Sequence, residues 1–161
     1  MNQTKHWKRV AAGICGAVLF AGCSKDKDRI KDTEYPSIDV TAAAAFPRQC
    51  SELIRGQQFT AKILVADNAA LGSVSIDVHH NFDHHSHSTE VNTCSMDPVK
   101  TPVKPLLLVK SIPVPPGNST YTATAQIEIP ADADTGDYHF MIKVTDKEGW
   151  QTIKGLSIKI K

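Results

Sequence analysis

Five histidines lie within nine residues of this sequence, and imidazole is the commonest side-chain ligand for zinc, copper and nickel. The tract contains His79, His80, His84, His85 and His87, with Asp83 among them. On composition alone, a short histidine-rich tract of this kind indicates a metal site. The alternative is a solvated loop that responds to pH and holds no physiological metal.

The elements that must position these rings are β-strands. Polar and apolar residues alternate with a period of two, between turn residues, in the stretches 58–65, 73–80, 121–129, 138–144 and 150–160. No stretch shows a convincing helical repeat with caps. About seven short strands in roughly 127 residues is the size of an immunoglobulin-like sandwich. The sequence therefore predicts an all-β, immunoglobulin-like β-sandwich over residues 35–161.

Alternation within the strands predicts where the imidazoles point. Apolar residues occupy alternate positions in 73–80 and 138–144, so His79 and His139 face outward and His80 faces the core. The two stretches correspond to strands C and F of the sandwich, which are neighbours in one sheet. Directly opposed side chains have Cβ atoms about 5 Å apart, which allows two imidazoles to share one metal. His79 and His139 are therefore a predicted two-strand platform for a metal.

The loop after the first of these strands is expected to complete the metal site. One or two of His84, His85 and His87 would join the two strand histidines. Asp83 would be either a further ligand or a hydrogen-bond acceptor for a ligating histidine. Nitrogen ligands with a possible carboxylate suit zinc, and copper is the second choice. His80 has a simpler explanation, as a hydrogen-bonded ring at the edge of the core.

Sequence signatures of catalysis are missing from the chain. It has no His-Glu-x-x-His motif, no Gly-x-Ser-x-Gly motif and no glycine-rich phosphate loop. Asp77, Asp83 or Glu90 could act as a general base beside a catalytic zinc, but nothing marks out one of them. We therefore expect a binding protein and not an enzyme.

The start of the chain has the features of a secretion signal. A basic beginning and the apolar stretch 10–19 lead to Leu-Phe-Ala-Gly-Cys at 19–23, which resembles the lipobox of bacterial lipoproteins. We expect a lipoprotein signal peptide over 1–22, lipidation of Cys23, and a charged, flexible tether over 23–34. The alternatives are a secretory signal cut elsewhere or an uncleaved anchor. The expected location is the outer membrane, held by the lipid, with the leaflet left open.

The cysteine count agrees with an oxidising compartment. Cys15 would leave with the signal and Cys23 would carry lipid, so Cys50 and Cys94 remain. Two thiols in such a compartment most simply form a disulfide with each other. The alternative makes Cys94 a soft metal ligand beside the histidines, which would leave Cys50 without a partner.

Length, charge and hydrophobicity exclude several classes of protein. The 161 residues suffice for one domain and a tail. The net charge of +1 argues against nucleic acid as a partner. The hydrophobic fraction of 41% is enough for a packed core. No run reaches the roughly 18 apolar residues of a membrane span, which excludes a multi-span protein.

The stretch 95–116 contains six prolines around the apolar run 106–109. Prolines keep a segment out of central ladders and favour an edge strand with rigid flanks. We expect the apolar run to be a buried strand D, and the alternative is a patch that binds a partner.

Three groups of residues carry a resemblance to a known family. They are Phe-Pro-Arg-Gln-Cys at 46–50, the histidine run at 79–85 and Gly-Asp-Tyr-His-Phe at 136–140. With them the chain is similar to the Bacteroides-type lipoproteins grouped as domain of unknown function 4625. The resemblance implies an immunoglobulin-like fold and an envelope location, and it leaves the activity unassigned. The stretch 136–150 also resembles strands F and G of bacterial immunoglobulin-like modules, which implies that Tyr138 is a corner tyrosine whose hydroxyl bonds back to the chain.

Two functions are compatible with these expectations. The first is binding of a transition metal at the cell envelope by the histidine cluster. The alternative is a non-catalytic module for adhesion, carbohydrate binding or an outer-membrane uptake complex, with an outer-membrane protein as a possible partner. Carbohydrate sites favour exposed aromatic platforms, and the strand pattern is expected to bury most of Trp150, Tyr35, Tyr121 and Tyr138.

Overall fold

The computed structural model describes residues 32–87 and 94–161. The predicted signal peptide, the lipidation site Cys23 and most of the predicted tether lie outside the described residues. Asp32, three positions before the predicted start of the domain at residue 35, is 8% exposed and bonded to Asn68. No helix among the described residues is long and apolar enough to cross a membrane.

Within the described residues the chain forms eight strands and no helix. They are β1 (Ser37–Asp39), β2 (Ser51–Leu53), β3 (Gln58–Ala66), β4 (Leu71–His80), β5 (Leu108–Pro113), β6 (Thr120–Glu128), β7 (Gly136–Asp146) and β8 (Gln151–Ile160). The five stretches with clear alternation correspond to the five longest strands. β1 and β2 are three residues each, which is too short for a period of two to be recognised.

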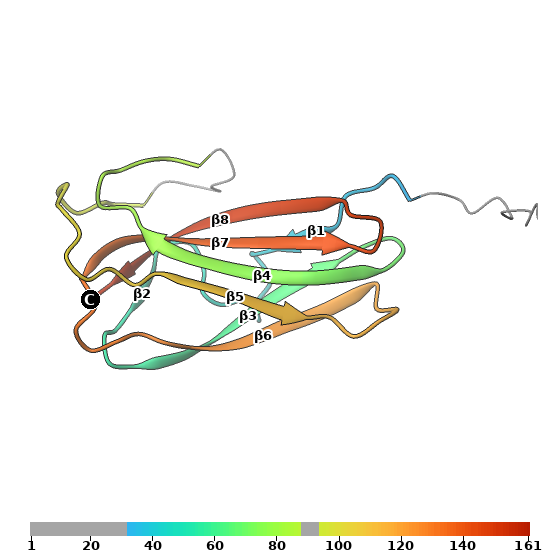
Figure 1. The fold of residues 1–161 in the computed structure, drawn as a ribbon, viewed down its shortest axis with the longest axis horizontal. Coiled ribbons are helices and arrows are strands. Elements are labelled where there is room, and N and C mark those ends of the chain that lie inside the picture. The colour runs from blue at the N-terminus through green and yellow to red at the C-terminus, as the bar shows by residue number, and fades with distance from the viewer. Residues whose placement is uncertain (1–31, 88–93) are drawn as a thin grey trace, which may run out of the picture. The chain divides into compact units, whose positions relative to one another are not determined.

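The strands form two sheets, in the order β1-β3-β6 and β2-β8-β7-β4-β5 (Figure 1). β2 runs parallel to β8, and the other strand pairs of the described residues are antiparallel. β3 and β6 occupy the positions of strands B and E, while β4, β7 and β8 occupy those of C, F and G. The predicted all-β, immunoglobulin-like sandwich is confirmed.

The core lies between the two sheets and follows from the alternation. Val74, Ile76 and Val78 of β4 are at most 2% exposed, and Ile142 of β7 is equally buried. They pack in one cluster with inward residues of β3 such as Ile63. Because successive strand residues point to opposite faces, the residues between them lie on the outer face of the five-stranded sheet.

The expectation of a buried strand D at 106–109 is wrong. β5 starts at Leu108 and pairs with β4 at the edge of the five-stranded sheet, where Val109 is 76% exposed and Ile112 is buried. An edge strand of a two-layer sandwich covers the core with one face only. A continuous apolar run therefore leaves every second side chain in solvent.

Tyr138 is a corner tyrosine, as predicted. Its side chain is 1% exposed, and its hydroxyl donates to the carbonyl of Asp134 at 2.7 Å and accepts the amide of Leu106 at 3.2 Å. Burial raises the pKa of Tyr138. These bonds secure the beginning of β7 beside His139.

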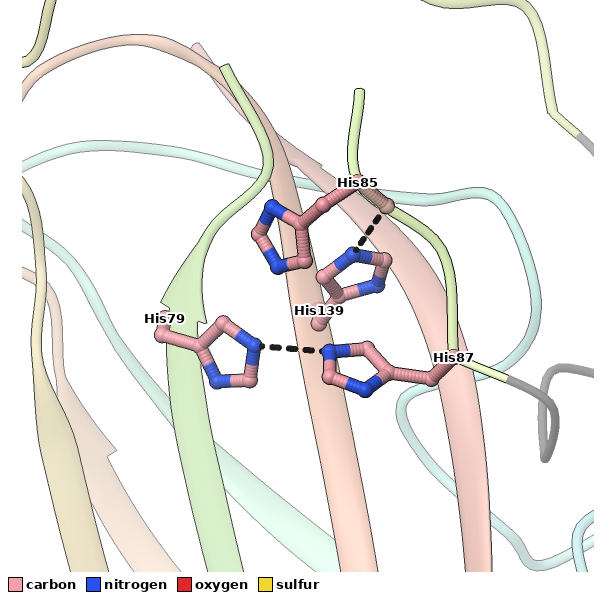
Figure 2. A group of neighbouring side chains, drawn as sticks. All are labelled: His79, His85, His87 and His139. Atoms are coloured by element: carbon pink, nitrogen blue, oxygen red, sulfur yellow. Dashed lines mark hydrogen bonds between the residues drawn. The ribbon is translucent and has the colours of Figure 1, made fainter. Parts of the chain in front are cut away.

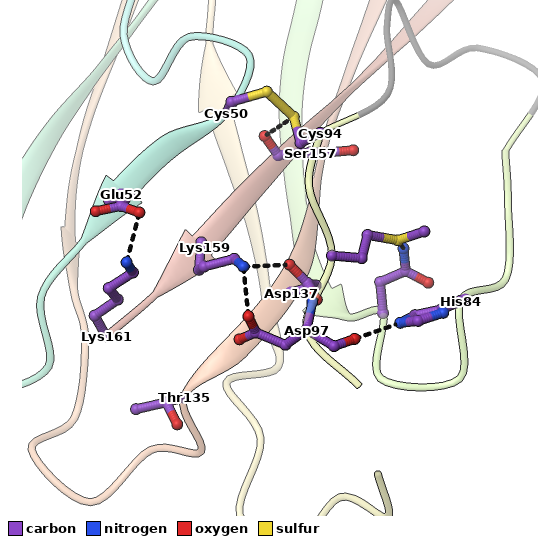
Figure 3. Close-up of polar contacts among 12 residues, drawn as sticks. Cys50, Glu52, His84, Cys94, Asp97, Thr135, Asp137, Ser157, Lys159 and Lys161 are labelled. Carbon is purple, nitrogen blue, oxygen red and sulfur yellow. Dashed lines mark hydrogen bonds and ion pairs between the residues drawn. A yellow bond between two sulfur atoms is a disulfide. The ribbon is translucent and has the colours of Figure 1, made fainter. Parts of the chain in front are cut away.

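Cys50 and Cys94 form a disulfide, which confirms the predicted pair and excludes Cys94 as a thiolate ligand (Figure 3). The segment after Cys94 is held on the same end of the sheet by Lys159 of β8. Its ammonium lies 2.6 Å from Asp97 and 3.4 Å from Asp137. The disulfide and this ion-pair group attach the returning chain to β7 and β8, next to the histidine-rich loop.

Candidate metal centre

His79 and His139 are directly opposed on neighbouring strands. β4 and β7 pair in a register that places His79 opposite His139, and their ring centroids are 5.3 Å apart. Both side chains project from the outer face of the five-stranded sheet. The structure therefore contains the two-strand platform that alternation predicted, between residues that are 60 positions apart in the chain.

The loop after β4 turns back over this platform. The amide of Asn81 donates to the carbonyl of Asp137 at 2.8 Å, and His84 adopts a left-handed φ of 58°, which reverses the direction of the chain. His85 and His87 then lie over β7, with ring centroids 4.8 and 4.6 Å from that of His139. Figure 2 shows the four rings gathered between β4, β7 and the loop.

One nitrogen from each of His79, His85, His87 and His139 lies within 4.8 Å of the others. Nε2 of His79 and Nε2 of His87 are 3.2 Å apart. Two nitrogens bound to one tetrahedral zinc at 2.0–2.1 Å are about 3.3 Å apart. This pair already has the spacing of two ligands on one tetrahedral zinc, and the remaining nitrogens, all within 4.8 Å, would close around an ion between the rings.

Oxygen acceptors orient three of the four rings. Nδ1 of His79 lies against the carboxylate of Asp77, and Nδ1 of His85 is 2.6 Å from that of Asp83. Nε2 of His139 is 3.2 Å from the backbone carbonyl of His85. An N–H that donates to oxygen leaves the lone pair on the other ring nitrogen, which is the arrangement that metal-binding histidines use. The bond from His85 also lowers the pKa of Asp83.

The histidines of the cluster differ in how far they are buried. His139 is fully buried, although alternation predicted a solvent-facing ring, because the loop histidines cover it. The side chain of His79 is 27% exposed and that of His85 is 36% exposed. A bound metal ion uses the same rings in their neutral form.

Two of the predicted ligands lie outside the converging nitrogens. His84 points away from the cluster, and its Nε2 is 2.8 Å from the carbonyl oxygen of Asp97 (Figure 3). Asp83 acts as the hydrogen-bond acceptor for His85, one of the two roles expected for it. His80 stacks on Phe82 at the edge of the core, with ring centroids 4.9 Å apart.

Asp77 is a site residue whose role the sequence prediction missed. Alternation places Asp77 beside His79, but the only role predicted for it is that of a possible general base, whereas its carboxylate contacts the ring of His79. The signal was available, because residues i and i+2 of a strand lie on the same face. An aspartate two positions before an outward histidine could therefore have been predicted to orient the ring.

An apolar depression of about 350 Å³ lies beside the cluster on the outer face of the five-stranded sheet. Its lining includes His79, Val109 of β5, Met141 of β7 and Ile153 of β8. Val109 and Ile153 are 76% and 44% exposed, so this face presents apolar side chains to solvent.

Comparisons with known proteins place the chain in a family. No curated protein matches the chain. Among solved structures, it resembles a "GspB Siglec domain", with a TM-score of 0.42 and 18% identity over 81% of this chain and 59% of that one. It also resembles a family 123 glycoside hydrolase from Clostridium perfringens, with a TM-score of 0.42 and 14% identity over 71% of this chain and 23% of that one. The chain thus spans less than two thirds of either structure.

The match to a family is broader than either of these. The family profile with the description "Domain of unknown function (DUF4625)" matches residues 21–161, which include the whole histidine cluster and both disulfide cysteines. The resemblance in sequence is confirmed at the level of the family. The chain belongs to the DUF4625 family.

Proposed function

We propose that this protein binds a transition metal, with zinc as the first choice, through His79, His85, His87 and His139. The observation that carries the proposal is the convergence of four imidazole nitrogens from β4, β7 and one loop within 4.8 Å. The oxygen acceptors behind three of the rings support it, because they orient each lone pair before a metal arrives.

The ligand set favours binding over catalysis. Four imidazoles would fill the tetrahedral shell of zinc, whereas catalytic zinc sites keep one position open for water or substrate. A group of neutral nitrogens suits zinc and copper(II) better than calcium or magnesium, which prefer oxygen. We therefore propose capture or sensing of metal, with copper as the second choice.

Zinc titration of the purified full-length chain tests the proposal. Wild type should bind one zinc, and its melting temperature should rise with added zinc because only the folded state holds the site. The double variant His79→Ala/His139→Ala should lose stoichiometric binding. His84→Ala is the matched control, since His84 belongs to the same tract but points elsewhere. Wild-type protein that stays metal-free and melts unchanged in zinc would reject the proposal.

We also propose that the protein is a lipoprotein of the cell envelope, anchored in the outer membrane through Cys23. The lipobox-like ending of the apolar segment supports this location. Metabolic labelling with a fatty acid should mark wild type and should fail for Cys23→Ser. Equal labelling of the two proteins would remove the anchor from the proposal.

The second candidate is an accessory module that docks on an outer-membrane protein. The apolar depression lined by Val109, Met141 and Ile153 favours it. Capture of an envelope partner that persists in His79→Ala/His139→Ala and fails in Val109→Asp would support this candidate over metal binding. Capture that fails in His79→Ala/His139→Ala and persists in Val109→Asp would count against this candidate and leave the metal site as the proposed function.

A further inference from the structure

Three aspartates from separate segments meet at the other end of the β4–β7 ladder. Asp32 precedes β1, Asp67 follows β3, and Asp146 ends β7, where it pairs with Leu71. One carboxylate oxygen from each aspartate lies within 4.8 Å of the others. The trio is about eight strand residues, or roughly 25 Å, from the histidine cluster. It is therefore a separate group of ligands.

Asp146 is the most buried of the three aspartates and has an unpartnered oxygen. It is 4% exposed, and its Oδ1 accepts the amides of Gly149 and Trp150 at 2.6 and 2.8 Å. Its Oδ2 is buried and has no hydrogen-bond partner among the described residues. Asp67 is similar, because Oδ2 accepts the amide of Ala69 at 2.9 Å while Oδ1 is buried and unpartnered.

Asp32 completes the trio from the N-terminal side. It is 8% exposed, and its Oδ1 accepts the amide of Glu34 at 2.9 Å and the side-chain amide of Asn68 at 3.0 Å. These two bonds lower the pKa of Asp32, the bond from Glu34 most strongly. Within residues 32–87 and 94–161, no ion pair joins any of the three aspartates to a lysine, arginine or histidine.

Three close carboxylates need a counter-charge that the described chain does not supply. A buried acceptor without a partner is destabilising, and so are like charges at this spacing. A cation removes both costs at once, because it pairs with the unpartnered oxygens and neutralises the carboxylates. The turns that hold the aspartates bond to their other oxygens, so the group is arranged before an ion arrives.

We propose that Asp32, Asp67 and Asp146 form a calcium site. Carboxylate oxygens are hard ligands, which select calcium or magnesium over zinc and copper. Two oxygens bound to one calcium at 2.3–2.6 Å can lie up to about 5 Å apart, so the observed spacing fits without rearrangement. Magnesium at 2.0–2.1 Å demands a tighter, near-octahedral set. Water and backbone carbonyls would supply the remaining calcium ligands.

Calcium at this position would attach the first residues of the domain to two of its loops. Asp32 lies nine positions after Cys23, on the segment that leads into β1. Asp67 belongs to the β3–β4 turn and Asp146 to the β7–β8 turn. The ion would therefore stiffen the point at which the N-terminal segment joins the sandwich, and it would do so independently of any metal at the histidines.

Calorimetric titration of the purified full-length chain with calcium chloride tests this site. Wild type should bind one calcium with a dissociation constant of about 10⁻⁴ to 10⁻³ M, the range of extracellular modules. Asp67→Asn and Asp146→Asn should each weaken binding by about tenfold or more, because each removes one ligand charge. Asp39→Asn is the matched control: Asp39 also caps a turn, through the amides of Thr41 and Ala42, but lies outside the trio.

Terbium luminescence provides a second measurement that does not depend on the aspartate variants. Terbium replaces calcium and is excited by a nearby indole, and Nε1 of Trp150 donates to the backbone carbonyl of Asp32 at 3.0 Å. Wild type should show terbium emission that calcium displaces, and Trp150→Phe should lose it. Calcium binding in His79→Ala/His139→Ala should equal that of wild type, so failure of either proposal leaves the other testable. Absent calcium heat, or unchanged affinity in both aspartate variants, would overturn the site.

Discussion

The carboxylates behind the histidines are the most informative place to perturb the proposed zinc site. Asp77 contacts Nδ1 of His79, and Asp83 is 2.6 Å from Nδ1 of His85. Replacing either aspartate by asparagine keeps an oxygen acceptor of the same shape but removes the charge that raises the basicity of the ring. None of the four imidazoles changes, so a loss of affinity would report orientation and basicity and not a missing ligand.

The structure predicts the order of the effects. Loss of an orienting partner weakens metal affinity by about tenfold to a hundredfold, or about 1.4 to 2.7 kcal/mol. The Asp77 side chain is 47% exposed against 27% for its histidine, while Asp83 and His85 are 65% and 36% exposed. Water screens the Asp83–His85 pair more strongly, because this pair is more exposed. The loss of zinc affinity should therefore be close to a hundredfold in Asp77→Asn and close to tenfold in Asp83→Asn.

Competition with a chromophoric zinc chelator at neutral pH measures these affinities. Asp132→Asn serves as the control, since Asp132 is an exposed aspartate that pairs with Lys104. Unfolding curves of all three variants should overlap with wild type, which separates orientation from stability. Wild-type zinc affinity in Asp77→Asn, or a larger loss in Asp83→Asn than in Asp77→Asn, would refute the assigned geometry.

Three further predictions concern stability. The disulfide closes a loop with a sequence separation of 44, so Cys50→Ala/Cys94→Ala should lower the free energy of unfolding by about 4 kcal/mol in urea titrations. Tyr138→Phe removes two hydrogen bonds to partly buried backbone groups and should lower the free energy of unfolding by about 1–3 kcal/mol, again measured in urea; no change would contradict the corner role. The hydrogen bond from Lys159 lowers the pKa of Asp97, so its stabilisation is complete above the unfolded value of about 3.9 and is lost as the pH falls through the folded value. The melting temperature should therefore drop below pH 4 more steeply in wild type than in Asp97→Asn, and parallel curves would disprove this linkage.

Much of the fold could be predicted from the sequence because alternation is a local property. The long strands β3, β4, β6, β7 and β8 each carry a recognisable period of two. The same period predicted that His79 and His139 lie on one face of the sheet. The order of strands in an immunoglobulin-like sandwich predicted that they are neighbours, and they pair in the β4–β7 register. The burial of the apolar run 106–109, which leads into β5, was predicted wrongly, because the local pattern does not show that one face of this edge strand lies in solvent.

The path of the histidine loop was decided only by tertiary structure. Sequence could not choose among His84, His85 and His87, because a loop has no period to assign a face. The choice follows from long-range bonds, such as that from Asn81 to Asp137 and that between His84 and Asp97. The first of these bonds turns the loop back over β7, and the second holds His84 away from the cluster.

The three aspartates of the proposed calcium site show most clearly the difference between what a local pattern predicts and what tertiary structure decides. Asp32, Asp67 and Asp146 are separated by 35 and 79 positions, and each resembles an ordinary turn aspartate in its own segment. By itself the sequence determined the five long strands, the outward faces of the two strand histidines and the cysteine pair. The tertiary structure alone decided which loop imidazoles join them and that three turn carboxylates meet, because turns acquire neighbours only when the sheets that carry them have packed.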